Sequence, residues 1–337
     1  MIFSDEQTPD VSNLYARLGN KSPHFCFAGH TDVVPLGNPD LWSVNPFGGE
    51  IIEDVLFGRG ATDMKSAIAA FVAAVSRVVN TQEIKGSVSL LITGDEEGPA
   101  INGTRKVLEW MRQKGEKIDA CLVGEPTNPQ KLGEMVKIGR RGSLTGTLTV
   151  TGVQGHTAYP HLADNPIPRL IRMLDAITSK DLDKGTEHFQ PSNIQITSID
   201  TNNPASNVIP SKATAKFNIR FNDKHTGDSL KNWLLDKCNL IGGDFSLEVK
   251  VSGEAFHTPR NDFITLIVES IHSVTGVEPV LSTSGGTSDA RFIKDFCPVA
   301  EFGLVGQTMH KIDERIAVAD IISLTDIYAA ILAKYFR

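Results

Sequence analysis

Short apolar runs alternate with helical patterns along the first third of the chain. Strands are predicted over residues 24–34, 87–93 and 120–124, where apolar and β-branched residues cluster. Apolar positions at helical spacing predict helices over 64–79 and 104–114. Strands that alternate with helices in this way form an α/β sheet with helices on its faces.

The pattern changes at residue 143. From 143 to 151 apolar or small residues alternate strictly with threonines, which is typical of a half-exposed strand. The elements predicted next are a helix over 166–178, strands over 194–200 and 213–222, a helix over 228–240 and a strand over 245–251. The order β-α-β-β-α-β is that of the ferredoxin-like split unit.

The last part of the chain returns to the first pattern, with a helix over 262–274, a strand over 298–303 and a helix over 320–336. The prediction is therefore an α/β domain made of residues 1–142 and 256–337. A ferredoxin-like α+β domain, residues 143–255, interrupts it.

Composition narrows the class of protein. The 337 residues are 40% hydrophobic and 22% charged, as in ordinary globular proteins, and the net charge is −7. This charge argues against nucleic acid or an anionic membrane as a partner. The longest apolar stretch, 67–79, is interrupted by Ser76 and Arg77 and is too short to cross a bilayer. The first ten residues are polar and acidic, so no signal peptide is expected.

The four cysteines, Cys26, Cys121, Cys238 and Cys297, lie far apart and form no C-x-x-C pair. This usage is typical of a reducing compartment and argues against a thiolate zinc site. A cytoplasmic protein is the expectation.

Two ionisable residues interrupt the first predicted strand, in the stretch F-A-G-H-T-D-V-V-P at 27–35. Residues two apart on a strand point to the same face, so His30 and Asp32 should share one side. Burying either is costly without a partner. The pair is either the water-facing edge of a strand or a metal-binding histidine supported by a carboxylate.

Further acidic and imidazole groups stand at strand ends or in loops. They are Asp63, the pair Glu96 and Glu97, Glu125, and His310. Each has an ordinary alternative: Asp63 could cap the next helix, the glutamate pair could be a charged turn, Glu125 could be solvated, and His310 could be a plain surface or core residue. Sites in open α/β sheets form outside the carboxyl ends of the strands, so these groups should converge there.

A dense group of carboxylates does not stay ionised without cations. Carboxylates with two histidines and no cysteine suit Zn²⁺ or a similar ion, and there are more of them here than one catalytic zinc needs. Two metal ions that share a bridging carboxylate fit this set better. The sequence contains no H-E-x-x-H, G-x-S-x-G, P-loop or G-x-G-x-x-G motif.

With these groups in place, the chain resembles the M20 family of di-zinc aminoacyl and peptide hydrolases. The motifs that carry the resemblance are A-G-H-T-D-V-V-P, G-R-G-A-T-D-M-K, G-D-E-E-G, V-G-E-P-T, G-R-R-G-S-L, G-H-T-A-Y-P-H-L-A-D-N-P, S-N-V-I-P, S-G-G-T-S-D-A-R and T-M-H-K-I-D-E. The resemblance implies a zinc-hydrolase-type catalytic domain with a mixed sheet, and a lid and dimerisation domain inserted in it.

The resemblance also implies a ligand set. His30 and Glu125 would hold one zinc ion and Glu97 and His310 the other, with Asp63 bridging the two. Two Zn²⁺ ions per subunit are expected, with Co²⁺ able to substitute. In relatives the peptide bond after the bridging aspartate is cis, which implies a cis bond between Asp63 and Met64.

Catalytic roles follow from the same motifs. Glu96 would be the general base, which takes a proton from the attacking water and returns it to the leaving amine, and Asp32 would orient His30. His156 would reach the site of a partner subunit in a homodimer formed through 143–255, with Asn207 nearby. The positions that match the family's substrate pocket are Arg140, Ser143, Tyr159, Arg220, Gly286 and Thr287.

The implied substrate is the small molecule N-succinyl-LL-2,6-diaminopimelate, which would be hydrolysed to succinate and LL-2,6-diaminopimelate. Guanidinium groups suit its three carboxylates, although tandem arginines are more often a solvated face. The alternatives are another M20 deacylation, such as that of acetylornithine, or an inactive truncated form that only binds metal. Relatives usually carry a longer N-terminal segment with a helix, so exposed apolar surface and lower stability are expected.

Overall fold

The computed structural model describes residues 1–5 and 8–337, and these form two compact units that we describe separately. Unit 1 comprises Met1–Gly139, Thr258–Ser282 and Ser288–Arg337. Unit 2 comprises Arg140–His257 and Thr283–Thr287. The range 143–255, predicted from the sequence as an inserted domain, lies within unit 2, and the short segment 283–287 joins it there.

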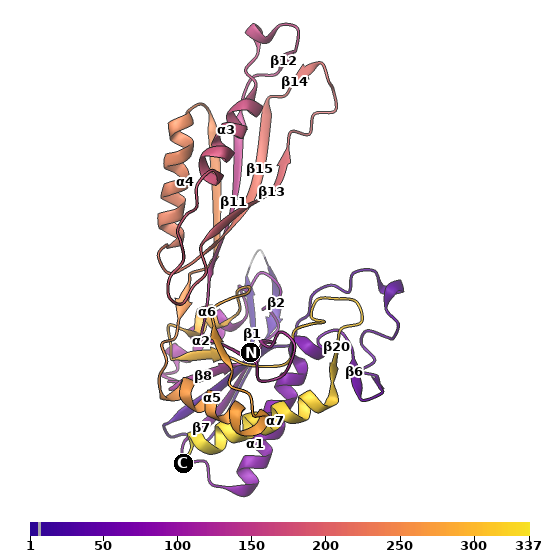
Figure 1. The fold of residues 1–337 in the computed structure, drawn as a ribbon, viewed down its shortest axis with the longest axis vertical. Helices are drawn as coiled ribbons and strands as arrows, with labels where there is room; N and C mark the ends of the chain where they lie inside the picture. Colours follow the sequence, from indigo (N-terminus) through magenta and orange to yellow (C-terminus); the bar gives the residue numbers. More distant parts are fainter. Residues whose placement is uncertain (6–7) are drawn as a thin grey trace. The chain divides into compact units, whose positions relative to one another are not determined.

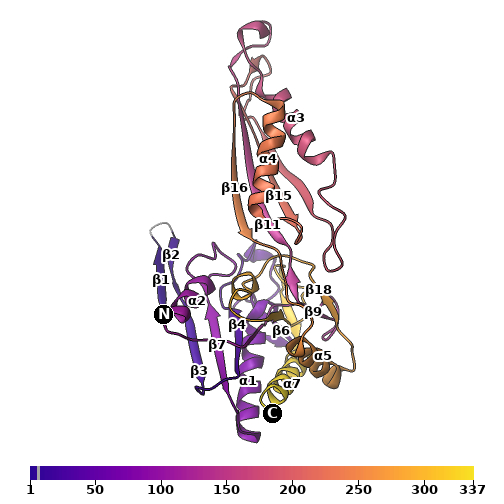
Figure 2. The ribbon, with the colours of Figure 1, turned by 90° about the vertical axis from the view of Figure 1, so that its left-hand side faces the viewer.

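Unit 1 is built on a seven-stranded mixed sheet (Figures 1 and 2). From one edge to the other its strands are β18 (Val280–Ser282), β9 (Met135–Lys137), β19 (Val299–Glu301), β8 (Ala120–Val123), β4 (His24–His30), β7 (Ser87–Thr93) and β3 (Leu14–Leu18). The four strands β19, β8, β4 and β7 are parallel, and β3 is antiparallel to β7. The predicted mixed α/β sheet is confirmed.

Helices cover both faces of this sheet. On one face lie α1 (Ser66–Thr81), α5 (Asp262–Thr275) and α7 (Val318–Tyr335). Phe25 and Phe27 of β4 point to this face, where Phe27 stacks on Phe71 of α1 and meets Tyr328 of α7 edge-on. The opposite face carries α2 (Thr104–Gln113), on which Trp110 packs against Tyr15, and the short α6 (Ala290–Ile293).

Several predicted boundaries in unit 1 differ from the structure: β19 covers Val299–Glu301 rather than 298–303, and α7 begins at Val318 rather than at residue 320. Two further differences have a clear local cause. Strand β4 ends at His30 rather than at residue 34, because the chain leaves the sheet there and the Asp32 carboxylate turns to the amides of Glu96 and Glu97. Helix α1 begins at Ser66 rather than at residue 64, because a tight turn, Ala61–Lys65, precedes it.

The N-terminal part of unit 1 is made of strands. A hairpin of β1 (Ile2–Asp5) and β2 (Thr8–Ser12) leads into the edge strand β3. Apolar side chains are exposed along this edge, with Leu14 52% and Leu18 51% accessible and Val72 of α1 47% accessible. The prediction that the first ten residues form no signal peptide falls partly outside the described residues, which lack positions 6 and 7.

Unit 2 has the predicted ferredoxin-like topology. Its antiparallel sheet runs in the order β13 (Asn193–Asp200), β15 (Lys212–Phe221), β11 (Gly142–Thr151) and β16 (Phe245–Gly253). Helices α3 (Pro166–Thr178) and α4 (Gly227–Ile241) pack on one face (Figure 2). The alternation predicted for 143–151 is observed in β11, in which Leu144, Leu148 and Val150 are buried against the helices.

Local chemistry explains where the helices of unit 2 begin. The Asn165 side chain accepts a hydrogen bond from the amide of Ile167 at the start of α3, and Thr226 and Ser229 form a capping box at the start of α4. In β11, Gly146 leaves room for the Phe217 ring of the neighbouring strand, which would be 2.2 Å from a Cβ there. The glycine is therefore part of the packing of this core.

The remaining elements are short. They are 3₁₀ helices at Pro39–Leu41 and Pro160–Leu162, and strands β5 (Ile51–Ile52), β6 (Val55–Phe57), β10 (Gly139–Arg140), β12 (Gly155–His156), β14 (Val208–Ile209), β17 (Phe256–His257) and β20 (Arg315–Ala317). All four cysteines are buried and free. Within 1–5 and 8–337, no helix has the length and apolar character needed to cross a membrane.

Candidate metal centre and substrate-binding residues

Three adjacent parallel strands deliver most of the acidic and imidazole groups of unit 1 to one edge of the sheet. His30 is the last residue of β4, Glu96 and Glu97 follow β7, and Glu125 follows β8. Because β4 lies between β7 and β8, the three strand ends are neighbours. The convergence predicted from the sequence is present, as expected for the carboxyl ends of parallel strands.

Loops supply the other two groups. Asp63 lies in the turn before α1, and the peptide bond between Asp63 and Met64 is cis, as the resemblance implied. Lys65 rather than Asp63 occupies the N-cap position of α1, so the helix-cap alternative for Asp63 is wrong. His310 lies between β19 and β20 with a left-handed backbone (φ 62°), and its side chain is 48% exposed.

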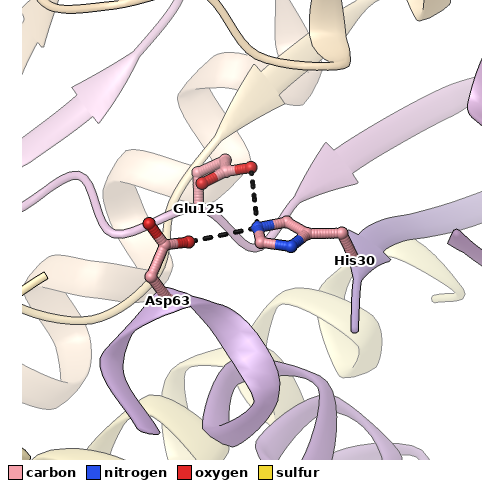
Figure 3. A group of neighbouring side chains, drawn as sticks. All are labelled: His30, Asp63 and Glu125. Carbon is pink, nitrogen blue, oxygen red and sulfur yellow. Dashed lines mark hydrogen bonds and ion pairs between the residues drawn. The ribbon is translucent and has the colours of Figure 1, made fainter. Parts of the chain in front are cut away.

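The first group of facing side chains consists of His30, Asp63 and Glu125 (Figure 3). The Nε2 atom of His30 lies 3.1 Å from Oδ1 of Asp63 and 3.6 Å from Oε1 of Glu125. All three residues are buried. Figure 3 shows both carboxylates pointing at the same imidazole nitrogen.

The second group shares Asp63 with the first. The Nε2 atom of His310 lies 3.2 Å from Oδ2 of Asp63 and 2.9 Å from Oε1 of Glu97. One oxygen of Asp63 therefore faces His30 and the other faces His310. A carboxylate with this arrangement is suited to bridge two cations.

These donor atoms fit a pair of divalent cations. In each group one imidazole nitrogen and two carboxylate oxygens lie within 4.8 Å of one another. Nitrogen and oxygen ligands without sulfur suit Zn²⁺ and related ions. His30 also forms a group with Glu96 and Glu97, so Glu96 lies close to the two groups without belonging to either.

The ionisation of these residues reflects crowding of negative charge. Burial raises the pKa of Glu125 well above its ordinary value, and the nearby Asp63 carboxylate adds to this. Hydrogen bonds from His30 and His310 outweigh the effect of burial on Asp63 and lower its pKa. The hydrogen bond to Asp63, opposed by burial, raises the pKa of His310 to about 9. The carboxylates thus draw positive charge into the cluster.

Asp32 has a wider role than the sequence suggested. Its carboxylate accepts hydrogen bonds from the backbone amides of Glu96, at 3.0 Å, and Glu97, at 2.9 Å. Nδ1 of His30 lies 3.0 Å from the backbone carbonyl oxygen of Asp32 and 3.6 Å from its carboxylate oxygen Oδ1. Asp32 therefore fixes the Glu96–Glu97 segment directly and the His30 ring through its main chain.

Glu96 has a distinct environment. Burial and the neighbouring Asp289 carboxylate raise its pKa to about 8. Asp289 is itself buried, which raises its pKa to about 6. The sequence motifs gave no role to Asp289, although it stands in S-G-G-T-S-D-A-R. They gave none to Arg59 and Glu314 either, which form a buried ion pair and flank Asp63 and His310 in two other motifs.

In unit 2 several of the predicted substrate residues gather where β11 begins. Ser143 on β11 is the register partner of Arg220 on β15. Arg140 precedes β11, and its Nη1 donates a hydrogen bond of 3.1 Å to the carbonyl of Gly286, next to Thr287. Arg220 is half-buried, and burial together with the nearby Arg141 lowers its pKa.

The other predicted residues of unit 2 lie at the opposite end of its sheet (Figure 1). His156 and Tyr159 are exposed on the loop after β11, with their rings 5.7 Å apart. Asn207 is exposed on the facing segment, where its carbonyl accepts from the amide of Thr157. Within unit 2 the predicted substrate residues therefore form two groups that lie at opposite ends of β11. One group is His156, Tyr159 and Asn207, and the other is Arg140, Ser143, Arg220, Gly286 and Thr287.

Comparison with known protein families agrees with the motifs. A family model described as Peptidase family M20/M25/M40 matches residues 26–334. A succinyl-diaminopimelate desuccinylase from Rhodospirillum centenum is 61% identical over 335 residues, which cover 99% of this chain and 87% of that protein. A protein of the same name from Parvibaculum lavamentivorans is 58% identical and covers 100% of this chain and 86% of its own length.

Solved structures show the same fold. A M20 family metallo-carboxypeptidase from Sulfolobus solfataricus superposes with a TM-score of 0.80 at 19% identity, covering 98% of this chain and 88% of the other. A dinuclear metal binding peptidase of the M20 family from Bacillus subtilis gives a TM-score of 0.68 at 14% identity, covering 100% and 88%.

Proposed function

The chain belongs to Peptidase family M20/M25/M40, and on this basis we propose that it is a metal-dependent amide hydrolase that converts N-succinyl-LL-2,6-diaminopimelate and water to succinate and LL-2,6-diaminopimelate. This reaction belongs to the biosynthesis of diaminopimelate and lysine. The observation that carries the proposal is the position of Asp63, whose two oxygens face His30 and His310 from opposite sides of one cluster.

The proposed cofactor is a pair of Zn²⁺ ions, for which Co²⁺ can substitute. His30 and Glu125 would hold one ion, Glu97 and His310 the other, and Asp63 both. When bound, such ions polarise a carbonyl oxygen and lower the pKa of a water molecule. The crowded carboxylates support the proposal, because so many of them need cations to remain ionised.

Glu96 is the proposed general base. It belongs to neither of the two ligand groups that share Asp63. Its backbone amide donates a hydrogen bond to the Asp32 carboxylate, which fixes its position. Burial and the Asp289 carboxylate raise its pKa to about 8, close to neutral pH. A carboxylate with such a pKa can both accept a proton and return it. In this role it takes a proton from the attacking water and delivers it to the amine that leaves.

The substrate residues proposed in unit 2 suit a ligand with several carboxylates. Arg140 and Arg220 provide guanidinium groups, which bind carboxylates with two parallel hydrogen bonds. Ser143 is the strand partner of Arg220, and Gly286 and Thr287 adjoin Arg140. These positions are proposed to bind the succinyl and diaminopimelate carboxylates.

The proposal includes a homodimer in which His156 and Asn207 act at the partner subunit's site, with Tyr159 beside them. From Ser143 to Thr151, β11 spans roughly 25 Å at about 3.3 Å per residue. One small substrate does not reach from Arg220 to His156 within a single unit 2, which supports a contribution from a second chain. Exposed Ile199, 55% accessible on the edge strand β13, offers apolar surface for such contact. The proposed location is the cytoplasm, in keeping with four free cysteines.

The proposal is tested by metal analysis together with an assay. We expect the purified protein to hold about two zinc ions per chain and to hydrolyse N-succinyl-LL-2,6-diaminopimelate much faster than acetylornithine. Chelation should abolish turnover, and Zn²⁺ or Co²⁺ should restore it. A preference for acetylornithine would overturn the substrate, and full activity in metal-free protein would overturn the mechanism.

A further inference from the structure

We propose that Glu314, with its ion-pair partner Arg59, is a positioning residue that sets the turn of Asp63 for metal binding. The proposal rests on the metal site proposed above. Glu314 is among the most buried charged residues described in the chain, with 1% of its surface accessible. It lies four residues after His310 and 251 positions after Asp63.

The carboxylate of Glu314 is saturated by donors from the Asp63 turn. Its Oε1 accepts from the backbone amides of Thr62, at 2.9 Å, and Asp63, at 3.0 Å. Its Oε2 accepts from the amide of Gly60, at 3.1 Å, and from Nη1 of Arg59, at 2.7 Å. Hydrogen bonds to an ionised acceptor are shorter and stronger than neutral ones.

These bonds fix the part of the chain from which the Asp63 side chain projects. The turn is not a regular helix, since Gly60 has a left-handed backbone (φ 83°) and Asp63 an extended one. Its amides therefore lack the ordinary helical acceptors, and Glu314 supplies acceptors for three of them. Holding the amide of Asp63 sets the direction in which its two oxygens face His30 and His310.

Arg59 extends the same connection to the other ligand segments. Its Nη2 donates to the carbonyl of Pro35, at 3.3 Å, in the loop that follows His30. Its Nη1 also donates to the carbonyl of Lys311, at 3.2 Å, next to His310. One ion pair thus contacts the segments that carry three of the five proposed ligands.

A buried ion pair is weak support for stability as such, because desolvating two charges offsets their attraction. The placement of this pair favours a positioning role instead. Groups that orient metal ligands typically change metal affinity 10- to 100-fold when they are removed. A residue that only held the fold together would change thermal stability and leave the affinity of the folded protein unaltered.

The test compares Glu314→Gln with the wild type and with Glu116→Gln. Glu116 pairs with Arg17 in unit 1 and also accepts from Tyr15, but it contacts none of the ligand segments. Zinc affinity is measured on metal-free protein by competition with a chromogenic chelator. Hydrogen exchange of residues 58–66 is measured on the same metal-free samples, with melting temperatures as a check on folding.

We expect Glu314→Gln to lower zinc affinity about 10- to 100-fold and to speed exchange in 58–66, with Glu116→Gln unchanged in both. Unchanged zinc affinity in folded Glu314→Gln would overturn the proposal. If that variant does not fold, the same measurements are made on Arg59→Lys. This substitution keeps the positive charge but loses the guanidinium group that donates to the carbonyls of Pro35 and Lys311. We expect a smaller but measurable loss of affinity, and no loss would overturn the proposal. Wild-type protein that binds no zinc would instead overturn the metal site itself.

Discussion

Glu96 and Glu97 are neighbours in sequence and have opposite surroundings. They lie in a bend after β7, and Glu97 is the one grouped with Asp63 and His310. The structure gives this place to Glu97, whose Oε1 lies 2.9 Å from the His310 ring, and leaves Glu96 half-buried beside Asp289. Asp32 holds the backbone amides of both, which keeps the two side chains in these places.

This difference predicts different effects for the same substitution. Glu96→Gln should keep the zinc content and lower kcat by about 10²- to 10⁴-fold, because it removes proton transfer and leaves both ligand groups complete. Glu97→Gln should lower zinc content, because it removes a carboxylate from one ligand group. Zinc per chain and kcat measured on both variants check the prediction. Full activity of Glu96→Gln with normal zinc would show that another residue is the base.

At the scale of elements, long periodic segments were predictable and contacts distant in sequence were not. The alternation of 143–151 and the order of strands and helices in unit 2 gave the ferredoxin-like topology. The early start predicted for α1 failed because the non-helical turn at Asp63 carries no periodic signal of its own. Strands of two or three residues, such as β5 and β20, are too short for a period. The contacts of Glu314 could not be predicted because its partners lie more than 250 positions away.

The loop between α3 and β13 depends on one carboxylate. The Asp183 side chain is 6% exposed and accepts hydrogen bonds from the amide of Gly185, the side-chain amide of Asn222 and the ring of His225. Burial would raise its pKa, but these hydrogen bonds and those from Ser192 prevail and lower the pKa from 3.8 to about 2. The ionised carboxylate therefore stabilises unit 2.

The depressed pKa has a definite consequence for acid stability. The stabilisation is complete above pH 3.8 and is lost as the pH falls through about 2, since the carboxyl group is then protonated in both the folded and the unfolded state. Asp183→Asn should lower the free energy of unfolding by about 2 kcal/mol at pH 7 and by less near pH 2. Calorimetry of both proteins across this range, with the exposed Asp181→Asn as control, checks it. An equal difference at both pH values would contradict the prediction.

At the scale of the whole molecule, the proposed metal ligands and the proposed substrate-binding residues lie in different units. Each has its own hydrophobic core, one around Phe27, Phe71 and Tyr328 and the other around Leu148 and Phe217. All five proposed metal ligands belong to unit 1. Unit 2 holds the residues proposed to recognise the substrate and the partner subunit.

Metal removal should therefore weaken one unit only. A ligand that binds the folded state alone stabilises it by about 4 kcal/mol at a free concentration 1,000 times its dissociation constant. Because that stabilisation reaches unit 1 and not unit 2, chelation should lower the melting temperature of unit 1 and leave that of unit 2 in place. Calorimetry can separate the transitions, with Trp42 and Trp110 in unit 1 and Trp233 in unit 2 as fluorescent reporters. A chelator that shifted the Trp233 transition as far as the others would mean that the two units unfold as one.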